Sequence, residues 1–139
     1  PELGTIPALT VPRVILTSNA TRELSDALRR RCLYFHLDYP EMEKELQIVL
    51  LHLPEIERRL AQQVVSFVQA LRELDLRKKP GIAETLDWAR TLCGLQIEVL
   101  DDDLSVIVNT MASLIKTYDD RSQINDAVIG ELLHGVRAG

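Results

Sequence analysis

None of the six glycines in this sequence is followed by lysine, so a phosphate-binding loop of the GxxxxGK[ST] type is absent from it. No apolar run ends in Asp-Glu, the pair that would hold Mg²⁺ and polarise a water molecule. These 139 residues by themselves therefore lack the parts of a self-sufficient ATPase.

Long apolar stretches and a targeting leader are missing as well. No hydrophobic run approaches the roughly 20 residues that a membrane-spanning helix needs, and no basic, apolar and small-residue leader opens the chain. With 46% hydrophobic, 27% charged and only 4% aromatic residues, the composition is typical of soluble, helix-rich globular proteins. We expect a cytoplasmic protein without membrane contact. The first residues, PELGTIPALTVP, lack a starting Met and resemble the middle of a domain.

The first forty residues predict two short strands around a helix. Residues 13–18 (RVILTS) are apolar and β-branched, which is typical of a buried central strand. Residues 32–37 (CLYFHL) alternate between two faces, as a second strand would. Between them, residues 23–30 predict a short helix, with Thr21 or Ser25 available as its N-cap.

After Pro40 the hydrophobic period changes from two to about 3.6, which indicates helices. They are predicted at residues 41–53, 57–74, 82–93, 104–118 and about 120–134. Gly94 is predicted to cap the C-terminus of the third. The expected fold is mainly α: a strand-helix-strand remnant in residues 1–40, followed by a bundle of four to five helices in residues 41–139.

Cysteine and acidic residues give no positive sign of a metal or nucleophilic site. Cys32 and Cys93 lie far apart, without CxxC spacing, and we expect two reduced thiols. Cys32 and His36 share a face of the predicted strand, but about 13 Å of strand separates them, too far for a thiol-imidazole nucleophile. Asp101-Asp102-Asp103 lacks the alternating oxygens and glycine turn of a calcium loop. We interpret this acidic run as the start of a helix, stabilised by the helix dipole, and predict no metal site.

Three consecutive arginines, Arg29-Arg30-Arg31, need an electrostatic reason because the net charge of the chain is −5. Arginine holds phosphate oxygens with a fork of donors. A solvated basic last turn of a helix is the simpler alternative, since the helix dipole favours it. The acidic balance argues against general nucleic-acid binding, while a local contact with one phosphate remains open.

Three phrases carry a resemblance: PELGTI at the start, VILTSNATRELSDALRRRC at residues 14–32 and IAETLDWARTL at residues 82–92. Through these phrases the chain resembles the second half of an AAA+ ATPase module of the MoxR type. The branch that it resembles includes CoxD-like ATPases, which mature metalloenzymes. The resemblance covers essentially the whole chain. It implies that residues 1–40 are the end of an α/β P-loop core and that residues 41–139 are its α-helical lid.

The resemblance also implies roles for three residues. Asn19, at the end of the first predicted strand, matches the sensor 1 residue, which holds the attacking water and reads the γ-phosphate. Arg31 matches the arginine finger, which reaches the nucleotide of the neighbouring subunit. Arg30 is the alternative, because three consecutive arginines leave the register open by one residue.

The predicted lid departs from the family at its third helix. The family places a sensor 2 arginine near the start of that helix, where this chain has Ala83 or Glu84. Either this contact is lost, or Lys78 or Lys79 supplies the charge from the turn that ends at Gly81. The equal alternative is that both lysines are solvated turn residues, and Glu84 suits a first-turn cap better than a phosphate ligand.

The resemblance implies a ring, expected to be a hexamer, in which ATP and Mg²⁺ bind between subunits. Hydrolysis would remodel a client protein through a von Willebrand factor A-domain partner. The isolated chain is expected to bind neither ATP nor Mg²⁺ and to be inactive. The alternative is a non-enzymatic helical interaction or regulatory domain whose Arg29-Arg30-Arg31 patch docks an acidic partner or nucleic acid.

Overall fold

The computed structural model describes residues 9–18, 24–100 and 104–137. The chain divides into two compact units, Pro1–Leu37 and Asp38–Gly139. In the first unit the described residues form one helix, α1 (Asp26–Arg31). Ser25 is its N-cap, and the hydroxyl of Ser25 accepts a hydrogen bond from the N–H of Leu28 at 3.4 Å. The predicted helix is therefore present with one of its two predicted caps, but it begins at Asp26 instead of residue 23 and ends at Arg31 instead of residue 30.

The two strands expected on either side of α1 are not formed in the described residues. Residues 13–18 and 32–37 have no strand pairing, and Ile15, Leu33 and Phe35 are largely exposed. A strand is stabilised by hydrogen bonds to a neighbouring strand, so an apolar segment without such a neighbour stays outside a sheet. The strand-helix-strand prediction is thus not met by the structure.

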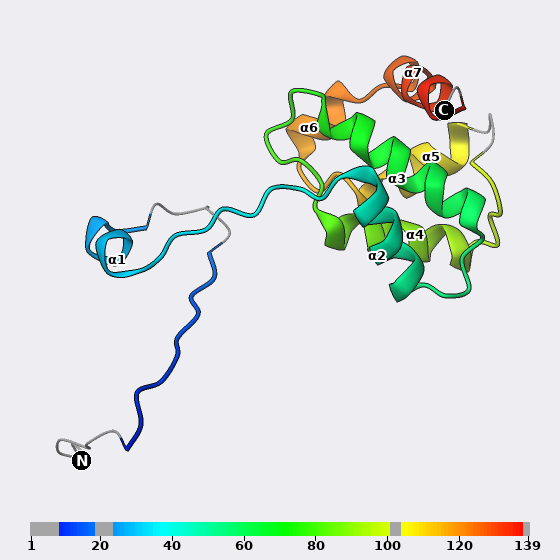
Figure 1. Ribbon diagram of the computed structural model, residues 1–139. Helices are drawn as coiled ribbons and strands as arrows, with labels where there is room; N and C mark the ends of the chain where they lie inside the picture. The colour runs from blue at the N-terminus through cyan, green and yellow to red at the C-terminus, as the bar shows by residue number, and fades with distance from the viewer. Residues whose placement is uncertain (1–8, 19–23, 101–103, 138–139) are drawn as a thin grey trace, which may run out of the picture. The chain divides into compact units, whose positions relative to one another are not determined.

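The second unit (residues 38–139), called the helical unit below, is all-helical in its described residues. Its elements are α2 (Met42–His52), α3 (Arg58–Arg72), α4 (Ile82–Gly94), α5 (Leu104–Thr110), the 3₁₀ turn η1 (Met111–Ser113), α6 (Tyr118–Gln123) and α7 (Asp126–Arg137). Helix α3 lies against α2, α4 and α7, so it forms the centre of the unit (Figure 1). The predicted helical bundle is confirmed in outline.

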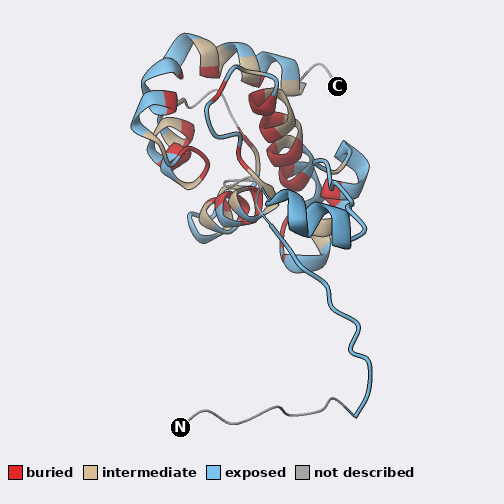
Figure 2. Cartoon of the chain, turned by 90° about the vertical axis from the view of Figure 1, so that its left-hand side faces the viewer, coloured by how far each residue is buried: buried red, intermediate tan, exposed pale blue. Residues whose placement is uncertain are grey.

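Apolar residues at helical spacing explain why α3 is central. Its buried side chains lie along one broad stripe: Leu60, Ala61, Val64, Val65, Phe67, Val68 and Leu71. Figure 2 shows the buried residues gathered on the inner sides of the helices of this unit. Trp88, the only tryptophan, is fully buried, with its ring 5.0 Å from that of Phe67. Its indole N–H donates to the Thr110 hydroxyl at 2.8 Å, so the one polar atom of this ring is satisfied.

The last two predicted helices are shorter than expected. The helix predicted at 104–118 ends as α5 and the η1 turn, and the helix predicted at about 120–134 is divided into α6 and α7. Asn125 explains the division: its side-chain oxygen accepts from the N–H of Val128 at 3.0 Å and starts α7. The stripe that begins at Ile124 therefore spans a helix boundary.

Helix α4 ends in a Schellman motif built on Gln96, so the cap predicted at Gly94 is wrong. Gln96 is in the left-handed region, with φ of 58°. The N–H of Gln96 bonds to the carbonyl of Cys93 at 2.9 Å, and that of Ile97 to the carbonyl of Leu92 at 3.0 Å. Gly94 is the last helical residue and takes no left-handed conformation.

Within the described residues, no helix combines the length and the apolar character that crossing a membrane requires.

Candidate functional site

The arginine triplet forms the last turn of α1, and all three side chains are exposed. The guanidinium of Arg29 lies over the ring of Tyr34, 5.7 Å from its centroid, so this arginine has an aromatic partner within the chain. Arg30 and Arg31, the predicted finger positions, project from a short helix where they can meet an anion from outside the chain. Asn19, the predicted sensor, lies outside the described residues, as does the acidic run at 101–103.

The turn that carries Lys78 and Lys79 is held by a buried carboxylate. Asp120 accepts hydrogen bonds from the backbone N–H of Arg77 at 2.8 Å and of Lys78 at 3.2 Å. The hydroxyl of Thr117 also donates to it. These bonds, that of Thr117 first, lower the pKa of Asp120 against the opposing effect of burial. The turn therefore has a defined backbone position, although both lysines are exposed.

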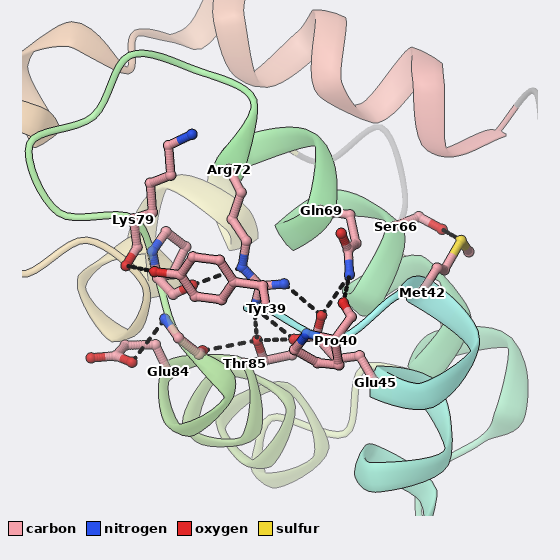
Figure 3. A network of polar contacts seen from close by, with 12 residues as sticks. Tyr39, Pro40, Met42, Glu45, Ser66, Gln69, Arg72, Lys79, Glu84 and Thr85 are labelled. Atoms are coloured by element: carbon pink, nitrogen blue, oxygen red, sulfur yellow. Dashed lines mark hydrogen bonds and ion pairs between the residues drawn. The ribbon is translucent and has the colours of Figure 1, made fainter. Parts of the chain in front are cut away.

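A carboxylate already occupies the N-terminus of α4. The Oε2 atom of Glu84 accepts from the N–H of Gly81 at 3.0 Å, which closes the first turn as in a capping box. The Nζ atom of Lys78 lies 4.0 Å from the other carboxylate oxygen, whereas the Lys79 side chain points away from this contact (Figure 3). Of the three predicted phosphate contacts, Gly81 and Lys78 thus already face an anionic side chain. A phosphate would fit at this turn only with Glu84 displaced, since two anions would repel each other there.

A buried ion pair lies beneath the same turn. Both Nη atoms of Arg72 donate to the carboxylate of Glu45, at 2.6 and 2.7 Å, and the two side chains are 4% and 0% exposed. The Nε–H of Arg72 donates to the carbonyl of Pro80 at 2.8 Å. Thr85 adds a hydroxyl that donates to Glu45 at 2.8 Å. Helices α2, α3 and α4 thereby meet at one polar centre, which Figure 3 shows.

The segment that leads into the helical unit joins the same centre. The side-chain amide of Gln69 donates both to Glu45 at 2.8 Å and to the carbonyl of Pro40 at 3.0 Å. The ring of Tyr39 covers the guanidinium of Arg72 at 4.7 Å, and its hydroxyl donates to the carbonyl of Lys79 at 3.4 Å. Residues 39–40 and 79–80, far apart in sequence, are therefore held side by side (Figure 3).

Sequence reasoning missed this centre, although a signal was present. Arg72 follows Val65 and Val68 at helical spacing, so a charged residue stands in register with an apolar stripe. Glu45 does the same beside Val49 on α2. Charges at core positions of two helices are a sign of a buried pair, because one such charge alone would be costly to bury.

The described residues also offer a cavity but no group of side chains suited to a metal ion. A cavity of about 180 Å³ lies between α5, α6 and α7, lined by Val108, Met111, Arg121, Ile124, Asp126 and Ile129. Among the described residues, no three His, Cys, Asp or Glu side chains gather closely enough to hold a metal ion. Cys93 is half-buried, and burial raises the pKa of its thiol. Cys32 is exposed.

Comparison with known proteins gives one informative similarity. The chain is 29% identical over 123 residues to the gas vesicle ATPase GvpN of Haloferax mediterranei. The similar region is 84% of this chain and 35% of that protein, so the chain spans about a third of the length of this relative. No family model and no solved structure matches the chain. The similarity supports a distant relationship to AAA+ ATPases.

Proposed function

We propose that this chain supplies the end of the core and the helical lid of a MoxR-type AAA+ ATPase. The observation that carries the proposal is the similarity to an ATPase along most of the chain. The exposed arginine triplet, placed directly before an all-helical unit, is consistent with it. Since the chain has no phosphate-binding loop, the loop would come from residues outside this sequence.

In this proposal Arg31, or Arg30 one residue earlier, is the arginine finger. A guanidinium beside the γ-phosphoryl of a neighbouring subunit neutralises the charge that develops during transfer, an effect of roughly 10³–10⁵ in rate in phosphoryl-transfer enzymes. Asn19 would orient the attacking water, because an amide both donates and accepts hydrogen bonds. ATP with Mg²⁺ would supply the phosphoryl group and its charge neutralisation.

The proposal includes assembly, since a finger that acts on another subunit requires one. A ring, expected to be a hexamer, would place Arg31 at each subunit boundary. Hydrolysis would then drive remodelling or maturation of a client protein, with a von Willebrand factor A-domain protein as the adaptor. The chain alone would bind no nucleotide and turn none over.

The contacts proposed for the lid itself are Lys78, Lys79 and Gly81. The carboxylate of Glu84 opposes a second anion at Gly81 and Lys78. Lys79 keeps its charge clear of Glu84 and is the lysine we assign to the nucleotide (Figure 3). The proposal as a whole rests on the similarity to an ATPase and does not depend on these lid contacts.

The test uses the ATPase that contains this chain, with Arg31→Ala as the variant. Turnover should fall by roughly 10³-fold or more while ATP binding is retained, because the finger acts on the transition state. Arg59→Ala is the matched control: Arg59 is an exposed arginine on α3, and its loss should leave turnover unchanged. Full turnover in both Arg31→Ala and Arg30→Ala would overturn the assignment.

Mixed assemblies separate a finger acting on a neighbour from one acting within its own subunit. Arg31→Ala subunits keep an intact nucleotide site, and subunits defective in nucleotide binding keep an intact finger. Mixing the two should restore part of the activity, because each supplies what the other lacks. No recovery in the mixture would argue against action between subunits.

A second candidate function is a non-enzymatic helical interaction domain. The exposure of the three arginines and the absence of a phosphate-binding loop from the chain favour it. The triplet would then dock an acidic partner. The coding sequence upstream of Pro1 distinguishes the two: a GxxxxGK[ST] loop supports the ATPase, and its absence supports the interaction domain.

A further inference from the structure

We propose that Arg72 is a positioning residue that clamps two separate backbone segments to one buried point. The first segment is the incoming segment, residues 38–40, through which the chain enters the helical unit. The second is the turn at residues 77–81. The link to activity rests on the proposed function, because the incoming segment follows the arginine triplet along the chain.

The clamp binds backbone carbonyl groups because a proline lies at the end of each segment or within it, at Pro40 and Pro80. Pro40 and Pro80 have no N–H, so the carbonyl is the one hydrogen-bonding group on the backbone of each. The carbonyl of Pro80 accepts from Arg72 at 2.8 Å, and the carbonyl of Pro40 accepts from Gln69 at 3.0 Å. Gln69 is itself bound to Glu45, the partner of Arg72. Both prolines are therefore fixed by the same three side chains.

Tyr39 closes the clamp from the solvent side. It is 50% exposed, yet its ring lies 4.7 Å from the guanidinium of Arg72 and its hydroxyl reaches the carbonyl of Lys79. It is thus the only side chain in Figure 3 that joins the incoming segment directly to the turn. Because half of its surface is in water, replacing it removes the contact without opening the core.

Stability alone does not explain a buried ion pair at this place. Apolar side chains of similar volume in place of such a pair are often as stabilising or more so. Apolar side chains, however, provide no donor for the carbonyl of Pro80 and no cation for the ring of Tyr39. The Glu45–Arg72 pair therefore performs a task that an apolar replacement would lose: it holds the backbone of the incoming segment and of the turn.

The experiment measures the position of the incoming segment by electron paramagnetic resonance on this chain. Spin labels are attached at Asp38→Cys, in the incoming segment, and at Leu51→Cys on α2, two exposed positions of the helical unit, in a background with Cys32→Ser and Cys93→Ala. Tyr39→Leu, which removes the ring, should enlarge the population outside the main distance peak by about 2- to 30-fold, the range that a cation–π contact implies. Tyr39→Phe keeps the ring over Arg72 and loses only the 3.4 Å bond to the carbonyl of Lys79, so it should broaden the distribution much less than Tyr39→Leu.

A second variant tests Arg72 itself without leaving a charge buried alone. In the Glu45→Met/Arg72→Met double variant the fold should persist, as circular dichroism would show, while the distance distribution broadens as in Tyr39→Leu. The clamp would be overturned if Tyr39→Leu and the double variant both gave distance distributions as narrow as that of the spin-labelled chain without these substitutions. If the double variant unfolds, the comparison of Tyr39→Leu with Tyr39→Phe decides whether the clamp exists.

Turnover of the ATPase that contains this chain tests the link to the arginine triplet. Tyr39→Leu should lower kcat while the Kd for nucleotide stays constant, and Tyr39→Phe should restore kcat. A broadened distance distribution with unchanged kcat would overturn the link while leaving the clamp in place. Absence of ATPase activity in the unsubstituted protein would count against the proposed function, and the resonance measurement would still decide the clamp.

Discussion

Glu45 and Arg72, 27 residues apart on α2 and α3, form a two-pronged ion pair that water does not reach. Removing one partner would leave the other charge buried without compensation. We expect Arg72→Ala to lower the free energy of unfolding by about 3–5 kcal/mol. Urea unfolding followed through the fluorescence of Trp88 measures it, because that indole lies in the core of the same unit.

Two controls define this prediction. Arg59→Ala removes an exposed arginine from the same helix and should change the stability by less than about 0.5 kcal/mol. The Glu45→Met/Arg72→Met variant should lose less stability than Arg72→Ala, because it leaves no charge buried alone, although the carbonyl of Pro80 loses its donor. An Arg72→Ala protein as stable as Arg59→Ala would contradict the strength assigned to the pair.

Asp120 predicts a loss of stability in acid. The hydroxyl of Thr117, followed by the N–H groups of Arg77 and Lys78, holds the pKa of Asp120 below its ordinary value of 3.8. A carboxyl whose pKa is lowered on folding stabilises the protein fully above its unfolded pKa. That stabilisation is lost as the pH falls through the lowered pKa of the folded state. Denaturant midpoints should therefore decline as the pH falls below about 4.

The Asp120→Asn variant should show a flatter dependence on pH in that range, because it does not titrate there, and a lower midpoint at neutral pH. Asp119→Asn is the matched control: Asp119 is exposed and pairs with Arg77 at the surface. Its midpoint should fall with acid much as that of the unsubstituted chain does. Equal acid sensitivity of Asp120→Asn and the unsubstituted chain would argue against this account.

At the end of α4, glycine would suit position 96, which is left-handed, better than position 94, which is helical. Gln96→Gly should stabilise the protein by about 0.5–1 kcal/mol, because glycine adopts the left-handed conformation without strain. Gly94→Ala should add a similar amount, since a Cβ there meets nothing within 4 Å and Gly94 is helical. Thermal unfolding of the two single variants and of Gln96→Ala measures both effects. Destabilisation by Gln96→Gly, with Gln96→Ala unchanged, would be inconsistent with the Schellman motif.

The unpaired apolar segments of the first unit predict self-association. Val14, Ile15, Leu33 and Phe35 are all more than two-thirds exposed, and extended apolar backbone without a partner tends to pair with another chain. Sedimentation velocity at rising concentration should show dimers or larger species. Val14→Lys/Phe35→Lys should shift the distribution toward monomer, whereas a strict monomer at every concentration would contradict the expectation.

The first three helices of the helical unit were predictable because their apolar stripes are long and regular. The observed bounds of α2, α3 and α4 lie within two residues of those predicted. Later boundaries depended on single side chains, such as Asn125, whose amide starts α7 within an apparently continuous stripe. Periodicity does not detect such a cap, since it counts apolar positions only.

The strands show the limit of local patterns most clearly. Residues 13–18 and 32–37 have strand-like sequences, but a strand also needs a neighbour, which local sequence does not provide. At the candidate site, the exposed arginines and the turn lysines were recognisable from their sequence. The Glu45–Arg72 centre was not, because its meaning depends on two helices that pack together.

The exposed arginines at the end of α1 also determine how the chain would be cut. A protease that cleaves after arginine would find three consecutive accessible sites there, outside the helical unit. Lys79 is exposed too, but the following Pro80 makes its peptide bond a poor substrate. Cleavage at the triplet would release the helical unit from the arginine triplet. A neighbour that covers these side chains would therefore also determine how long the two units stay joined.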